Sequence, residues 1–120
     1  MARKFVFELQ AVLDQRHRAE QRAQAALAAI QQERLGIERE MDDLRCAVEL
    51  ERDVARSMMT GQLTATSLRE HIAGELGADR KARALAIKLA GVQKRIDAAR
   101  ELLRQASVQY QAIDRLREQR

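Results

Sequence analysis

The side chains of this 120-residue chain best suited to metal binding or nucleophilic chemistry are two histidines and one cysteine. His17 and His71 belong to different halves of the chain, and Cys46 lies two positions after Leu44. If Leu44 faces the interior of a helix pair, a step of two residues turns Cys46 toward the outer face. Because these groups do not converge, we expect no metal site, no cofactor and no enzymatic activity.

The composition is typical of long helices. Alanine, glutamate, lysine, leucine and arginine together make up more than half of the residues, and proline is absent. Only three aromatic residues occur, and 21 of the apolar residues are alanines. Large side chains are therefore too few for a thick globular core, and the composition indicates a thin, helical molecule.

Apolar residues in the first half recur at alternating steps of three and four, which is the spacing of a heptad seam. The seam passes through Val6, Leu9, Leu13, Ala23, Leu27, Ile30, Ile37, Met41, Leu44, Val48, Ala55 and Met58. Four of its positions are polar: Arg16, Glu20, Arg34 and Glu51. Their long stems could cover the seam while the charges reach water, or the polar groups could fix the register or meet another protein.

The second half carries a similar seam, formed by Leu85, Leu89, Val92, Ile96, Ala99, Leu103, Ala106, Tyr110, Ile113 and Arg117. Upstream of it, Leu68, Ile72 and Leu76 follow one another at steps of four, a spacing that departs from the heptad. We expect an irregular segment over residues 68–82, with exposed apolar side chains that are candidates for contact with a partner.

Turn residues separate the two seams. Gly61 favours the end of the first helix in a left-handed conformation, and Ser67 with Glu70 has the spacing of a capping box. The predicted fold class is all-α, with two long helices forming an antiparallel coiled-coil hairpin over residues 1–120. Helix one should cover about residues 4–59, the turn about 60–66 and helix two about 67–118.

The expected hairpin pairs residues whose numbers add up to roughly 123. This register brings Phe5 and Phe7 near Tyr110 at the end where the termini meet, as a plug against fraying or as an anchor for a partner. We call Phe5, Phe7, Tyr110, Arg115 and Arg117 the termini-end residues. The opposite end presents the turn-end residues, which are Met58, Met59, Leu68, His71, Ile72 and Leu76.

The charge and the absence of targeting signals bear on which functional classes and which compartment the protein could belong to. The formal net charge is +4, and the basic excess lies in residues 61–120, where 12 basic residues face 7 acidic ones. A nucleic-acid-binding hairpin is therefore one alternative, although aromatic residues are not interleaved with the cations. The first residues lack the apolar core of a secretory signal, and no apolar run approaches the roughly 20 residues of a membrane span, so we expect a cytoplasmic protein.

Two stretches carry a family resemblance. The opening Lys4-Phe5-Val6-Phe7-Glu8-Leu9-Gln10, with Val12-Leu13 and Arg16-His17-Arg18-Ala19-Glu20, resembles the start of the flagellar export protein family FliJ. The runs Val92-Gln93-Lys94-Arg95-Ile96-Asp97, Leu103-Arg104-Gln105-Ala106 and Tyr110-Gln111-Ala112-Ile113-Asp114-Arg115-Leu116 are similar to the second helix of that family.

The resemblance implies a small component of the flagellar type III export apparatus, cytoplasmic and peripherally associated with the inner membrane. Such a hairpin, like the central stalk of a rotary ATPase, would enter the hexameric export ATPase, contact the cytoplasmic domain of the membrane export gate and escort export chaperones. In this hypothesis the termini-end residues enter the ring and the turn-end residues face the gate and the chaperones. Related stalk proteins of virulence-type secretion machines share this shape, and the sequence does not separate the two.

Two further alternatives stay open. A weak seam and a methionine-containing tip would also suit a general coiled-coil scaffold or holdase that binds many unrelated apolar segments. Two opened hairpins could in addition pair their seams as a domain-swapped homodimer.

Overall fold

The computed structural model describes residues 2–58, 61 and 64–119. Helix α1 covers Ala2–Met58 and helix α2 covers Ala65–Glu118. All regular secondary structure among the described residues is therefore helical, which confirms the predicted all-α fold class. Both helices begin two residues earlier than the sequence pattern predicted. Met59, the last residue expected in helix one, lies outside the described residues.

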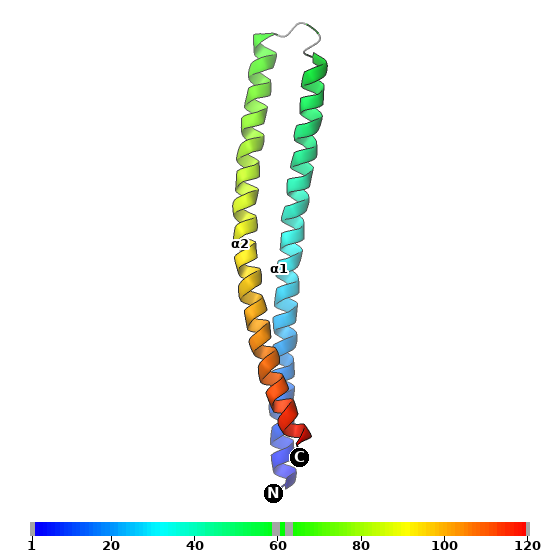
Figure 1. Ribbon diagram of the computed structural model, residues 1–120, viewed down its shortest axis with the longest axis vertical. Coiled ribbons are helices and arrows are strands. Elements are labelled where there is room, and N and C mark those ends of the chain that lie inside the picture. Colours follow the sequence, from blue (N-terminus) through cyan, green and yellow to red (C-terminus); the bar gives the residue numbers. More distant parts are fainter. Residues whose placement is uncertain (1, 59–60, 62–63, 120) are drawn as a thin grey trace. The chain divides into compact units, whose positions relative to one another are not determined.

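The chain divides into two compact units. The terminal unit comprises Met1–Gln32 and Gln93–Arg120, and the turn unit comprises Glu33–Val92. Within each unit, a segment of α1 lies beside a segment of α2 that runs in the opposite direction (Figure 1). The predicted antiparallel helical hairpin is thereby confirmed.

Buried side chains are few and unevenly distributed. Leu13, Ile96 and Ala99 form the core of the terminal unit, where Ile96 is completely buried. In the turn unit, Leu85 and Val92 are buried, whereas no described residue between 33 and 84 is. The seam residues of α2 in that stretch include Gly74 and Ala78, which are too small to fill the space between two helices. The turn unit is therefore the more loosely packed of the two.

Contacts between the helices have a register slightly offset from the predicted one. In the terminal unit, Arg16 bonds Gln109 and His17 stacks against Tyr110, so that the paired numbers add up to 125 and 127. In the turn unit, Arg52 faces Glu75, which again gives 127. Side chains on a helix lean toward its N-terminus. Two side chains whose ends meet across the hairpin therefore belong to residues about one position later in each helix than the residues whose backbones lie side by side. The observed sums exceed the predicted one by two to four, and this lean explains about two of that offset.

The ends of the helices at the turn differ from the prediction in chemistry. No described residue has a positive φ, so Gly61 does not adopt the left-handed conformation; its N–H instead donates to the carbonyl of Met58 over 3.0 Å. Thr64, rather than Ser67, caps α2: the Ser67 N–H donates to Oγ1 of Thr64 over 3.1 Å. Thr64 belongs to the same class of good capping residues, and a cap there extends the helix by most of a turn.

Near the turn, the predicted exposure of Leu68, Ile72 and Leu76 is confirmed, but the irregular segment expected over residues 68–82 is not found, because the seam of α2 keeps its heptad spacing there. Ser67, His71, Gly74 and Ala78 are the partly buried positions, while Leu68, Ile72 and Leu76 are exposed. Residues four apart drift by about 40° around a helix at each step, so the Leu68 row winds away from the partner helix. The partly buried positions keep the alternating steps of four and three that continue the seam from Leu85. Large apolar side chains are thus left outside the interface between the helices.

Candidate interaction surfaces

An open cleft of about 340 Å³ lies between the two helices of the turn unit, next to the turn. From α1 it is lined by Leu50, Glu51, Val54, Ala55 and Met58, and from α2 by Ser67, Leu68, Glu70 and His71. The apolar residues Leu50, Val54, Met58 and Leu68 are all exposed to solvent. We refer to this feature as the turn cleft.

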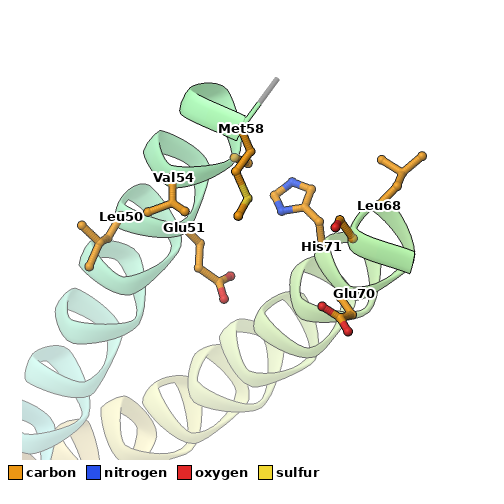
Figure 2. Close-up of a pocket in the computed structure, with 9 residues that line it drawn as sticks. Leu50, Glu51, Val54, Met58, Leu68, Glu70 and His71 are labelled. Atoms are coloured by element: carbon orange, nitrogen blue, oxygen red, sulfur yellow. The ribbon is translucent and has the colours of Figure 1, made fainter. Parts of the chain in front are cut away.

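Polar side chains also line the turn cleft. In Figure 2, Met58 and His71 point toward one another, and the carboxylate of Glu51 points from α1 toward α2. Gly74 lies opposite that carboxylate: a Cβ atom at Gly74 would lie 3.5 Å from Oε2 of Glu51, which is ordinary van der Waals contact. The polar seam position Glu51 thus faces a residue without a side chain.

His71 also belongs to a polar cluster that joins the helices. Its Nε2 lies 3.4 Å from Oε1 of Glu75, a contact that is an ion pair when the imidazole is protonated. The same Glu75 oxygen lies 3.9 Å from Nε of Arg52 on α1. Pairs of this kind between exposed side chains contribute little to stability, about 0–1 kcal/mol each. They do not compensate for the lack of buried apolar side chains among the described residues from 33 to 84.

The structure brings only some of the predicted turn-end residues together. Met58, Leu68 and His71 line the turn cleft, whereas Ile72 and Leu76 are exposed but are not among its lining residues. Met59 lies outside the described residues. Leu50 and Val54 are functional candidates that the sequence reasoning missed. Their signal was the spacing of four between Leu50, Val54 and Met58, which forms an apolar row beside the seam.

The terminal unit exposes a second apolar surface. Phe7 is 77% exposed and Val6 60%, although Val6 was predicted to lie in the seam, while Phe5 is only marginally exposed. A shallow hollow there is lined by Ala2, Arg3, Val6, Phe7 and Gln10, all from α1. Side chains this exposed do not form a plug between the helices. Of the two readings left open, the exposure of Phe7 favours the anchor for a partner.

Two other termini-end residues have partners away from Phe7: Tyr110 contacts His17, and Arg117 pairs with Asp114 of the same helix. The ring that contacts Tyr110 is His17, at 5.1 Å between centroids, and His17 lies ten residues beyond Phe7 on α1. The predicted cluster of Tyr110 with Phe5 and Phe7 is wrong for this reason. Nη2 of Arg117 lies 2.9 Å from Oδ1 of Asp114, and the side chain of Arg115 is exposed.

The cysteine, the possible metal ligands and the hydropathy of the helices were the remaining features to place in the described part of the chain. Cys46 is exposed, as its position after Leu44 predicted. Across residues 2–58, 61 and 64–119, no group of three or more His, Cys, Asp and Glu side chains has the arrangement of a metal site. In the same part of the chain, neither helix contains a stretch with the length and hydropathy of a membrane span.

Comparison of the chain with protein-family models, with curated proteins and with solved structures finds no match.

Proposed function

We propose that this protein is a non-enzymatic, stalk-like component of a type III protein export apparatus of the flagellar kind. In this proposal it binds and stimulates the hexameric export ATPase, links it to the cytoplasmic domain of the membrane export gate, and escorts export chaperones. The observation that carries the proposal is that each unit of the hairpin exposes its own apolar surface. These surfaces are Val6 with Phe7 in the terminal unit and Leu50, Val54 and Met58 in the turn unit.

The two surfaces differ in their charged surroundings, as a protein with two different partners requires. Arg3 lines the hollow beside Val6 and Phe7 in the terminal unit. Glutamates line the turn cleft instead, at positions 51 and 70. We assign the terminal unit to the ATPase ring and the turn cleft to the gate and the chaperones. The likeness of Lys4–Gln10 to the start of the FliJ family supports this orientation.

The architecture suits insertion into a ring. Each unit is two helices wide, about 20 Å at a helix diameter of 10–12 Å. The surface is charged with both signs, with 22 basic and 18 acidic residues, which limits adhesion to the wall of a pore. Work at the export apparatus would place the protein in the cytoplasm, peripherally at the inner membrane.

The test is ATP hydrolysis by the export ATPase of the same organism, measured with and without the purified chain, together with light scattering to follow hexamer formation. We expect stimulation that saturates at one hairpin per hexamer. Phe7→Ala should reduce the stimulation several-fold, while Leu102→Ala, which changes a similarly exposed apolar residue of the terminal unit, should leave it unchanged. Absence of both binding and stimulation would remove the proposal.

The alternative is a general coiled-coil scaffold or holdase, which the loose packing of the turn unit favours. It predicts similar affinity for many unrelated apolar peptides and no preference for an ATPase. Nucleic-acid binding is a weaker alternative, whose signature would be an affinity that falls steeply with salt concentration.

A further inference from the structure

We propose that the turn cleft binds a basic amphipathic helix of a partner protein, whose apolar side chains pack against Leu50, Val54 and Met58. The inference rests on the proposed function, which assigns this surface to the gate and the chaperones. It goes further because it states the chemistry of the segment that binds.

The apolar row determines the geometry of the partner. Leu50, Val54 and Met58 are four residues apart, so each lies about 6 Å along α1 from the next. All three are more than half exposed. Such a row beside a cleft between two antiparallel helices offers a groove into which the i, i+4 ridge of a third helix fits. The unburied apolar area would then be covered as in a three-helix bundle.

The backbone favours a helix over an extended peptide. Residues of α1 and α2 around the cleft are helical, so their N–H and C=O groups are already bonded within each helix. An extended segment would find no sheet edge to extend, and its own backbone groups would lose water without gaining partners. A helix satisfies its backbone internally and presents only side chains.

The charges of the cleft determine the sign of the partner. Glu51 and Glu70 are the carboxylates among its lining residues, and no lysine or arginine of the described chain lines it. Neither glutamate forms an ion pair with another described residue, whereas Arg52 and Arg56 on α1 are paired with Glu75 and Asp53. Two unpaired carboxylates beside an apolar row attract a helix with lysine or arginine along its margin.

The test uses the full chain and a fluorescent synthetic peptide of about 18 residues, with leucine at helical spacing and lysine at the flanking positions. A second peptide has glutamate in place of lysine. Fluorescence anisotropy gives the two dissociation constants, and far-UV circular dichroism shows whether the bound peptide is helical. We expect the lysine peptide to bind at least about tenfold more tightly and to become helical on binding.

Matched variants locate the binding site. Val54→Asp should abolish binding of the lysine peptide, whereas Val108→Asp should not, because Val54 and Val108 are 51% and 52% exposed and only Val54 lines the cleft. Replacing both Glu51 and Glu70 by glutamine should weaken binding of the lysine peptide and reduce its salt dependence. Glu49→Gln serves as the control, since Glu49 lines a different hollow of the turn unit.

Three results would overturn the inference: equal binding of the two peptides, unchanged binding by Val54→Asp, or a dimer in light scattering that Val54→Asp converts to a monomer. The last would mean that a second copy of this chain covers the cleft. Because peptide binding needs no ATPase, its failure is separate from the failure of the proposed function. Loss of ATPase stimulation with intact, charge-selective peptide binding would remove only the stalk role.

Discussion

Arg16 of α1 donates a hydrogen bond from Nη1 to Oε1 of Gln109 on α2, over 2.9 Å. Arg16 occupies a position of the heptad seam where an apolar residue is usual, and the next residue of each helix takes part in the stacking of His17 on Tyr110. A directional bond next to a ring contact is satisfied in one alignment of the two helices. A polar seam residue of this kind specifies register in addition to its small contribution to stability.

A double-mutant cycle measures the contribution of this bond. Arg16→Ala, Gln109→Ala and the double variant should give a coupling energy of about 0.5–1 kcal/mol, as is usual for an intramolecular hydrogen bond between exposed side chains. Urea unfolding followed by circular dichroism supplies the free energies of unfolding of the natural chain and of the three variants. Arg18→Ala combined with Gln109→Ala is the control pair and should show no coupling. A coupling of zero for Arg16 and Gln109 would contradict the assigned role.

Two isoleucines of α2 can be compared, Ile96 in the core of the terminal unit and Ile87 on the surface of the turn unit. Ile96 is completely buried, and Ile87 is 74% exposed. Ile96→Ala should lower the free energy of unfolding by about 2–4 kcal/mol, because it removes buried apolar surface and leaves a cavity. Ile87→Ala should change it by less than about 0.5 kcal/mol. Thermal and urea unfolding of the two variants check this, and a similar cost for both would show that Ile96 is not at the centre of the packing.

The fold could be predicted from the sequence because many seam positions repeat the same information about which face of each helix is buried. From Leu85 to Ile113 the seam positions are all apolar and keep alternating steps of four and three, and the one polar position, Arg117, comes only after them. The absence of proline and the turn residues near Gly61 then leave few arrangements other than a hairpin. Pattern and structure agree best from Leu85 to Ala99, where Leu85, Val92, Ile96 and Ala99 are buried, and less well at the seam residues Val6 and Met58, which are exposed.

The turn cleft could not be predicted in the same way. The sequence reasoning followed the largest apolar residues, Leu68, Ile72 and Leu76, whereas the helix kept its register with the small or polar Ser67, His71 and Gly74. The buried face near the turn is found by continuing the heptad spacing upstream from Leu85, and not by following the largest apolar side chains. The partnering of His17 with Tyr110 has no sequence pattern of its own, because it depends on an alignment of the two helices that a one-residue shift changes. Thr64 and Ser67 are both good capping residues, so residue type alone does not decide which of them caps α2.

The capping of α2 makes a prediction about two neighbouring hydroxyl groups. Thr64 accepts the Ser67 N–H, and its hydroxyl also shares a 2.7 Å hydrogen bond with the Ser67 hydroxyl. Thr64→Ala removes both interactions and should cost about 1 kcal/mol, whereas Ser67→Ala removes only the second and should cost less. Urea unfolding ranks the two variants. A larger cost for Ser67→Ala would restore the capping box that the sequence suggested.

The pKa of Glu101 should depend on Arg104. Two hydrogen bonds from the Arg104 guanidinium, Nε to Oε2 over 3.0 Å and Nη2 to Oε1 over 2.6 Å, lower the pKa of the Glu101 carboxyl. Arg104→Gln should therefore raise the pKa of Glu101, which a carboxyl carbon chemical-shift titration measures directly. Arg100→Gln, which changes an exposed arginine one residue from Glu101, should leave that pKa nearly unchanged and serves as the control.

The sign of the pH dependence follows from the lowered pKa of Glu101. A carboxyl whose pKa is lower in the folded than in the unfolded chain stabilises the fold above its unfolded pKa, and this contribution disappears as the pH falls through the folded pKa. Stability of the natural chain should therefore decline on acidification more than that of Arg104→Gln. Since Glu101 and Arg104 are exposed, high salt should shrink the difference between the two chains. Equal acid sensitivity at low salt would mean that the pair contributes nothing to folding.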